Sequence, residues 1–546
     1  MKQYSVYIKL ISLTLMIVFF YSACSSPPPP EPEPSVRNVI LIIADGMGYP
    51  SAGLLRSYAR YAPQSIYHDR DGISAMEQAM LDGFNGLLYT EPWNMPVADS
   101  AASGTQLATG HWSLPGIIGG DYRGNPVETV LQTAKRHGKS TGLVSDTRIT
   151  HATPAVFAAH VPVRYMENTI AEQLITLDYR PDVMLSGGLR HFLPESFNDP
   201  GSSIHEQLIR RHNIDSRIRS RRNDDRDLLA EAESNGYAVA LTRNDLIQTQ
   251  NERILGLFAA SAMPDAITEN RMYNDPDRTW PTLSEMTQHA LNTLDADPNG
   301  FFLMIEPGQI DWAGHNNDAG LLLHEMIRLD RVIDTVRSWA GTRDDTVIII
   351  TSDHDTGGFA FAYTVLKETP ESVQMEGSLF DDMDFVPNND YGDYGVLDTL
   401  YNQSCGCFEM FGRFRRLKTH EQTPARLADM VAECMGVQIT NDEAERILHT
   451  RPNPYLLEDD QEDTYRVLYV PNMGHDQAFY TSQTSMLCGL LARLTGIEWN
   501  IAWAVGTHTA SPVPLVVLGP THAIEQFSPV MHSTDVGQVM RSLVAN

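Results

Sequence analysis

The segment NVILIIADGMG, at residues 38–48, joins an apolar run to an aspartate set among small residues. The run at residues 38–43 is almost continuously apolar, which is typical of a strand buried on both faces of a sheet. Asp45 follows it closely, and Gly46 and Gly48 allow the backbone to approach a ligand. Because functional groups in open α/β sheets collect beyond the carboxyl ends of strands, the segment predicts a central strand with a site at its end.

Four more short apolar runs have the same character, at residues 183–186, 301–305, 347–351 and 515–518. Helical stretches lie between them at residues 127–136 and 320–340, the second with apolar residues at spacings of three and four. Strands that alternate with helices imply an α/β fold with a mostly parallel central sheet and helices on both of its faces. An arginine-rich surface excursion at residues 200–226 and an inserted subdomain at about residues 363–470 interrupt this rhythm.

The N-terminus has the pattern of an export signal. Lys2 and Lys9 precede an apolar run at residues 10–20 that is too short to span a bilayer unaided. The run ends in YSACSS, which resembles a bacterial lipoprotein cleavage site with Cys24 as the lipidated residue; an ordinary cleaved signal is the alternative. We expect a signal peptide at residues 1–23, a stiff proline-rich tether at residues 24–35 and a domain at residues 36–546. This places the protein in the periplasm or elsewhere outside the cytoplasm, with or without a lipid anchor.

Composition limits the binding partners. The formal net charge of −29 argues against binding to nucleic acid or to an anionic membrane surface. Such acidity also repels an anionic substrate unless bound cations reverse the field locally. Disulfides can form outside the cytoplasm, and Cys405, Cys407, Cys434 and Cys488 allow two bridges whose connectivity the sequence leaves open.

Acids and histidines recur at the ends of the predicted strands. They are Glu306, Asp311 and His315 after one run, Asp353 and His354 after another, and His508 shortly before the last. Each has a structural explanation alone, such as a turn or a helix cap, but together they predict a metal site. Carboxylates and imidazoles suit Zn²⁺, whereas an all-oxygen set suits Mg²⁺. Two zinc ions about 4 Å apart can clamp an in-line phosphoryl displacement.

The segment VADSAASGTQLATG, at residues 97–110, places Asp99 and Ser100 before a run of small residues. This composition suits a helix start, where the N-terminus favours an alkoxide or a phosphate ester. Taken alone, the segment is explained by Asp99 or Ser100 as an N-cap. Beside two metal ions, Ser100 is predicted to be a nucleophile whose small neighbours leave room for the metals and the phosphate.

Five ordered motifs resemble those of the alkaline phosphatase family, from about Val36 to the C-terminus and more weakly in the inserted segment. They are Asp45-Gly-Met-Gly, Asp99-Ser100-Ala-Ala-Ser, Glu306…Asp311…His315, Asp353-His354 and His508-Thr. The resemblance implies that Ser100 is phosphorylated during turnover. It also implies three ligand sets: Asp311, His315 and His508 for a first zinc, Asp45, Asp353 and His354 for a second, and Asp45, Thr153 and Glu306 for magnesium.

The same resemblance gives roles to three further residues. Arg164 stands where the family's phosphate-gripping arginine does, a role that suits a guanidinium forking onto two oxygens. His151 and Trp312 stand beside the third metal, where some bacterial members have aspartate and lysine, so we expect this metal to be held loosely. The implied cofactors are two zinc ions and one magnesium ion, the implied substrates are small phosphate monoesters, and the implied assembly is a homodimer.

Two alternatives stay open. One is a phosphodiesterase or sulfatase of the same superfamily, in which the nucleophile is commonly threonine or a modified cysteine. The other is a non-catalytic metal-binding surface lipoprotein, which leaves Ser100 and Arg164 unexplained.

Overall fold

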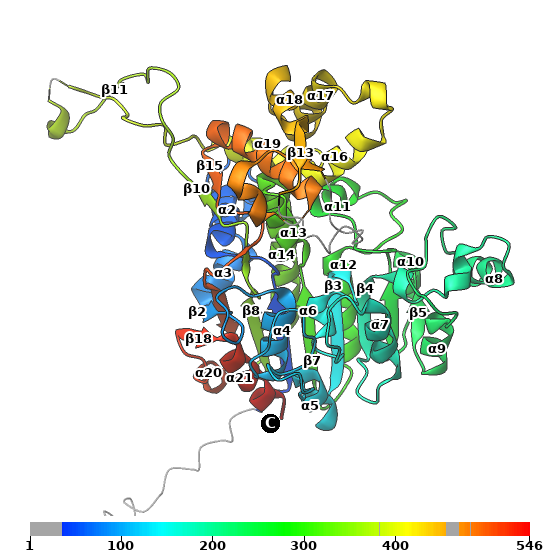
Figure 1. Ribbon diagram of the computed structural model, residues 1–546. Helices are drawn as coiled ribbons and strands as arrows, with labels where there is room; N and C mark the ends of the chain where they lie inside the picture. Colours follow the sequence, from blue (N-terminus) through cyan, green and yellow to red (C-terminus); the bar gives the residue numbers. More distant parts are fainter. Residues whose placement is uncertain (1–34, 382, 455–468, 481, 546) are drawn as a thin grey trace, which may run out of the picture. The chain divides into compact units, whose positions relative to one another are not determined.

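Ten strands pair into one sheet in the computed structural model, which describes residues 35–381, 383–454, 469–480 and 482–545. Their order across the sheet is β18-β2-β17-β8-β1-β7-β3-β4-β6-β5 (Figure 1). In chain order they are β1 (Asn38–Ile43), β2 (Phe84–Tyr89), β3 (Ser140–Arg148), β4 (Val183–Gly187), β5 (Ala238–Ala240), β6 (Ile254–Leu257), β7 (Phe301–Glu306), β8 (Thr346–Thr351), β17 (Val513–Leu518) and β18 (Val530–His532). The predicted signal peptide and Cys24 lie outside the described residues.

Strand β1 occupies the middle of the sheet and pairs in parallel with β7 and β8. Among the described residues, every pairing in this sheet is parallel except those of β17, which runs antiparallel to β2 and β8. The mostly parallel sheet predicted from the sequence is therefore confirmed. The reversal of β17 was not predicted, and it matters because the strand begins at the edge where the parallel strands end.

Alternate side chains of β1 enter two separate cores. Ile40 and Ile42 pack with one set of helices, while Val39, Leu41 and Ile43 pack with another. All five are buried, as expected for a strand covered on both faces. The sheet is thus the middle layer of three.

Each face of the sheet has its own layer of helices (Figure 1). The first layer contains α2 (Tyr49–Tyr61), α3 (Ala75–Asp82), α11 (Ala266–Met272), α12 (Leu283–Leu294) and α14 (Ala319–Ala340). The second contains α4 (Ser100–Thr109), α5 (Val130–Arg136), α6 (Ala152–Ala155), α7 (Glu167–Thr176), α9 (Leu228–Ser234) and α21 (Ser533–Ala545). Helices on both faces were predicted, and this is confirmed. None of the described helices is both long and apolar enough to cross a membrane.

Two helix starts show how local capping sets the element bounds. Helix α5 begins at Val130, later than the predicted residue 127, because Thr129 and Gln132 form a reciprocal capping box. Helix α14 begins at Ala319, where the Asp318 side chain accepts a hydrogen bond from the backbone N–H of Leu321.

The region at residues 200–226 is less superficial than its composition suggests. It contains α8 (Ser203–His212), and the Arg222 guanidinium is buried. Arg222 pairs with Asp224 and donates to the backbone carbonyl of His191 at 3.2 Å. An arginine-rich composition therefore did not mean an entirely solvated loop.

The described part of residues 363–470 forms small elements. They are β11 (Val373–Gln374), β12 (Asp384–Phe385), α15 (Gly395–Tyr401), α16 (Cys407–Arg416), α17 (Pro424–Met435), α18 (Asn441–Leu448) and β13 (Thr450–Pro452). Two disulfides join this region together and to the rest of the chain: Cys405–Cys434, and Cys407–Cys488, which reaches α19 (Gln483–Trp499). They resolve the connectivity that the sequence left open.

The remaining elements are short and lie outside the main sheet. They are β9 (Asp355–Thr356), β10 (Phe359–Phe361), α10 (Arg243–Gln248), α13 (Gln309–His315), β14 (Tyr469–Pro471), β15 (Ile501–Trp503), β16 (His508–Thr509) and α20 (Thr521–Ile524). Of these, α13 and the antiparallel pair of β9 with β16 carry residues of the predicted site.

Candidate active site

The predicted site residues converge on one edge of the sheet. Asp45 follows β1, Glu306 ends β7 and Asp353 follows β8, three adjacent parallel strands whose carboxyl ends meet there. His508 reaches the same edge because it precedes the reversed strand β17 and because β16 pairs with β9, directly after β8. The edge thus collects residues far apart in the sequence, as expected for an open α/β sheet.

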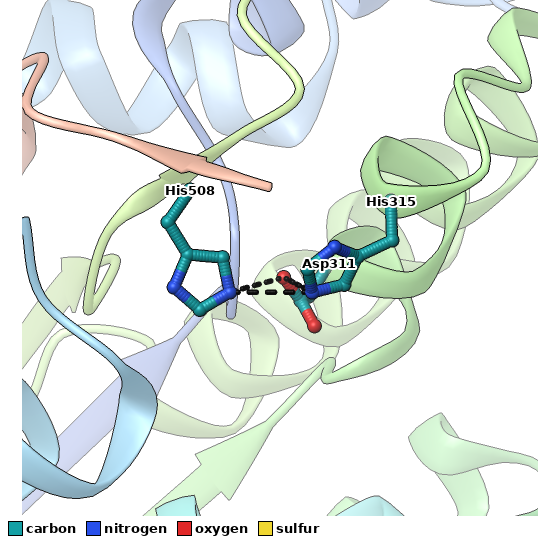
Figure 2. A group of neighbouring side chains, drawn as sticks. All are labelled: Asp311, His315 and His508. Carbon is teal, nitrogen blue, oxygen red and sulfur yellow. Dashed lines mark hydrogen bonds and ion pairs between the residues drawn. The ribbon is translucent and has the colours of Figure 1, made fainter. Parts of the chain in front are cut away.

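The first group of possible metal ligands is Asp311, His315 and His508, whose ligand atoms lie within 4.8 Å of one another. Figure 2 shows Asp311 and His315 on one helix, α13, with His508 facing them from its strand. Each histidine has its Nδ1 2.8 Å from a backbone carbonyl, that of Gly506 for His315 and that of Ala98 for His508. A neutral ring donating from Nδ1 keeps a lone pair on Nε2. The two Nε2 atoms face each other at 3.2 Å, each within 3.5 Å of an Asp311 oxygen, so a cation fits between them.

The second group is Asp45, Asp353 and His354, all fully buried. His354 Nε2 lies 3.6 Å from Asp45 Oδ1 and 3.3 Å from Asp353 Oδ2. Neither of these carboxylate oxygens has a hydrogen-bond partner among the described residues. Because a buried carboxylate oxygen without a donor is costly, a metal ion is the fitting partner, and two carboxylates with one imidazole suit zinc.

The carboxylates of the site oppose one another's ionisation. Burial raises the pKa of Asp45 well above its usual value, and the charges of Asp353, Asp311 and Glu306 raise it further. Burial likewise raises the pKa of Glu306 to about 8 and that of Asp353 to about 6. Such concentrated negative charge calls for cations, and metal ions held by these groups would supply them.

Ser100 opens helix α4 and is buried, with its Oγ 3.2 Å from His354 Nε2. The capping role belongs to Asp99, whose Oδ1 accepts a hydrogen bond from the backbone N–H of Ala102 at 2.9 Å. The Ser100 hydroxyl is therefore left to face the second ligand group. Its place at a helix N-terminus favours negative charge on Oγ.

The small residues of α4 pack closely against neighbouring elements. Ala101, Leu107 and Ala108 belong to a core cluster. A Cβ added at Gly104 would lie 3.2 Å from the Val156 side chain, just after α6. The small-residue run thus allows α4 to pack closely against its neighbours, and its leaving room for metals and phosphate stays a prediction.

The third group is Asp45, His151 and Glu306, again with ligand atoms within 4.8 Å of one another. Thr153, expected from the resemblance to be a magnesium ligand, donates from Oγ1 to Asp45 Oδ2 at 3.0 Å. Asp45 is therefore shared between the second and third groups. Glu306 Oε1 is buried with no hydrogen-bond partner among the described residues, which fits a further cation.

Arg164 and His151 are in direct contact. Arg164 donates from Nη1 to Asp99 Oδ2 at 3.0 Å and from Nη2 to His151 Nε2 at 3.2 Å. Burial and the Arg164 charge hold the pKa of His151 well below its usual value, so its ring is neutral. A neutral ring that accepts at Nε2 carries its proton on Nδ1, which lies 3.9 Å from Glu306 Oε1. The Trp312 ring lies edge-on to His151 with centroids 6.3 Å apart.

Sequence reasoning missed the residues that hold Glu306 in place. Glu306 Oε2 accepts hydrogen bonds from Thr147, at 2.9 Å, and from Ser145. Asp146, between them, accepts from the backbone N–H of Gly308 at 2.7 Å and pairs with the buried Arg328 at 3.0 Å. All three polar residues lie on β3, which was not predicted because its sequence STGLVSDTR is not continuously apolar.

The family of the chain follows from comparison with known proteins. The family model described as alkaline phosphatase matches residues 36–404, more than half of the chain. The chain belongs to the alkaline phosphatase family. Asp45, Ser100 and Asp353 lie within the matched residues, and His508 lies beyond them, brought to the site by the fold.

Individual relatives agree with this assignment. Alkaline phosphatase 4 of Bacillus subtilis is 32% identical over 336 residues, covering 60% of this chain and 63% of that protein. The repressible alkaline phosphatase of Saccharomyces cerevisiae is 34% identical over 376 residues, covering 66% of this chain and 62% of that protein. The matches thus span a little under two thirds of these relatives.

Solved structures share the fold over nearly the whole chain. The crystal structure of the Thermus thermophilus alkaline phosphatase has a TM-score of 0.69 and 25% identity, covering 95% of this chain and 96% of that one. The cold-active alkaline phosphatase of Shewanella sp. has the same fold, with a TM-score of 0.65 and 22% identity, covering 93% of this chain and 100% of that one.

Proposed function

We propose that this protein is a metal-dependent phosphatase that hydrolyses small phosphate monoesters through a phosphoserine at Ser100. The observation that carries the proposal is the contact between Ser100 Oγ and His354 Nε2, beside buried acidic oxygens that have no hydrogen-bond partner in the described part of the chain. A hydroxyl at a helix start, next to cation sites and a partly buried arginine, is equipped for attack on a phosphate.

The three ligand groups account for the proposed cofactors. We assign one zinc ion to Asp311, His315 and His508, a second to Asp45, Asp353 and His354, and a magnesium ion to Asp45, Thr153 and Glu306. Bound there, the metal ions would lower the pKa of the Ser100 hydroxyl and of an attacking water and would stabilise charge on the leaving oxygen.

The chain's own residues carry the two displacements. Ser100 Oγ loses its proton and attacks phosphorus, while the bond between phosphorus and the alcohol oxygen breaks on the opposite side and that oxygen takes up a proton. A water molecule then loses a proton and attacks the phosphoserine, and Ser100 Oγ leaves, regains a proton and releases inorganic phosphate as product. Arg164 binds two phosphate oxygens throughout, since Asp99 and His151 engage only two of its five N–H donors.

The alternatives are separated by substrate. The experiment compares p-nitrophenyl phosphate, bis-p-nitrophenyl phosphate and p-nitrophenyl sulfate before and after treatment with a chelator, with zinc and magnesium then restored. We expect the monoester to be hydrolysed fastest, and metals to be required. Faster hydrolysis of the diester or the sulfate overturns the monoesterase proposal, and no hydrolysis of any ester by the metal-loaded protein favours the non-catalytic lipoprotein.

The location and assembly of the protein are also proposals. We propose that residues 1–23 direct export, that Cys24 can carry lipid ahead of the tether, and that two chains associate as a homodimer. The motif at Cys24 and the family resemblance support them. Fractionation of cells and sedimentation of the purified protein test them.

A further inference from the structure

A cavity of about 480 Å³ adjoins the first ligand group. Trp312 and His315 of α13 line one side of it, and Phe408 and Glu409 of α16 line another. His315 therefore belongs both to the candidate metal group and to the cavity wall. Because it adjoins the first ligand group, the cavity offers space for the organic group of an ester whose phosphate is held at the proposed metal site.

The walls of the cavity are largely apolar. Met263 and Leu321 are buried, whereas Phe408 has 54% of its surface exposed. Together with Trp312, they offer two aromatic rings and two aliphatic surfaces to a bound group. Aromatic faces bind other rings and also attract cations.

The charged residues of the cavity are acidic. Asp265 and Glu409 line it, and no lysine or arginine does among the residues that the structure describes. Glu409 Oε1 accepts a hydrogen bond from Arg413 at 2.5 Å, whereas Glu409 Oε2 is buried with no hydrogen-bond partner among the described residues. A negatively charged group in the cavity would be repelled by these carboxylates, and a positively charged group would be attracted.

The wall that contains Phe408 and Glu409 is fixed in place at its base. Cys407 forms a disulfide with Cys488 of α19, and its backbone N–H donates to Asp318 Oδ2 at 2.6 Å. Asp318 also caps α14. A wall bound to two other helices is pre-organised, so little binding free energy is spent on ordering it when a ligand binds.

We infer that this cavity binds the alcohol portion of the substrate and favours monoesters with an apolar or aromatic group next to the phosphate and a positive charge farther out. The inference rests on the proposed function and specifies its substrate class. It gives the segment around α16 a role in specificity, in addition to the metal site.

The charge preference is tested with two substrates of similar shape, 4-(aminomethyl)phenyl phosphate and 4-carboxyphenyl phosphate. The ratio of the two kcat/KM values is measured in the metal-loaded parent and in Glu409→Gln. Comparing the two ratios cancels the different intrinsic reactivities of the substrates. We expect the substitution to reduce the ratio by roughly 2–5-fold, the size of a partly exposed charge interaction. Glu433→Gln removes the same charge from an exposed site on α17 and is the control. An equal ratio in the parent and Glu409→Gln overturns the charge preference.

The apolar contact is tested with Phe408→Ala. The ratio of kcat/KM for phenyl phosphate to that for methyl phosphate should fall by roughly 3–10-fold, the loss of one aromatic contact. Phe385→Ala removes an exposed aromatic residue that does not line the cavity, and serves as the control. An unchanged ratio in Phe408→Ala refutes a role for this wall.

A binding measurement separates this inference from the proposed function. Calorimetry on metal-loaded Ser100→Ala, with and without Phe408→Ala, compares phenyl phosphate with inorganic phosphate. If Phe408→Ala weakens the binding of phenyl phosphate and leaves that of inorganic phosphate unchanged, the cavity binds the organic group. Equal effects of Phe408→Ala on both ligands contradict such binding. If the parent hydrolyses no monoester, the proposed function fails, while calorimetry still decides whether the cavity binds the organic group.

Discussion

Replacing Arg164 by alanine should remove transition-state binding without removing the metals. Arg164 is partly buried, and Asp99 and His151 orient its guanidinium. Charge-assisted hydrogen bonds are worth roughly 1.5–3 kcal/mol each, so losing two sets an upper limit of about 6 kcal/mol. Water entering the vacated space restores part of this. We therefore expect a loss of about 1.4–4 kcal/mol, which is roughly 10–1000-fold in kcat/KM.

The structure indicates why Arg164→Ala should still fold. Asp99, the partner of Arg164, also accepts hydrogen bonds from the backbone N–H groups of Ala102 and Gly116, so its carboxylate keeps partners. The assay measures kcat/KM for p-nitrophenyl phosphate, inhibition by phosphate, and bound zinc. Phosphate inhibition should weaken and zinc content should stay constant. Arg217→Ala, at an exposed arginine paired only locally with Asp215, is the control. Unchanged kcat/KM in Arg164→Ala would refute substrate contact by Arg164.

Three further predictions concern the third metal, the tether and the core. His151→Asp should tighten magnesium binding, because a carboxylate adds negative charge where a neutral ring adds none. Combining it with Trp312→Lys should also strengthen phosphate binding. Equal magnesium affinities of the metal-depleted parent and His151→Asp in a titration would contradict the prediction for magnesium. Truncation through Pro34 should give a soluble, active enzyme. If Cys24 carries lipid, the Cys24→Ser variant should no longer be found in the membrane fraction, and unchanged membrane association of this variant refutes a lipid anchor. Arg328→Ala should lower the free energy of unfolding by about 3–5 kcal/mol, because it leaves buried carboxylates unpaired, and a denaturation midpoint equal to that of the parent would show otherwise.

The sequence predicted the centre of the molecule well because buried parallel strands have a strong local signature. The run at residues 38–43 matches β1 residue for residue, and Asp45, Glu306 and Asp353 lie at the sheet edge where acids after such strands should lie. The mixed polarity of β3 concealed that strand, and with it the residues that hold Glu306.

Other features depend on contacts that no local pattern encodes. The reversal of β17, which brings His508 to the site, depends on strand pairing across the sheet. The pairing of Cys407 with Cys488, 81 residues apart, depends on how α16 meets α19. The contact of Arg164 with His151 likewise arises only when two loops meet beyond β3.

Trapping the covalent intermediate tests the central claim most directly. The metal-loaded protein is mixed with a ³²P-labelled phosphate monoester, quenched in acid and digested, and the labelled peptide is sequenced. Ser100 faces His354 from the start of α4, so the parent should carry acid-stable label on Ser100. Ser100→Ala should carry none while retaining its zinc. Label on another residue, or label that persists in Ser100→Ala, would contradict the account.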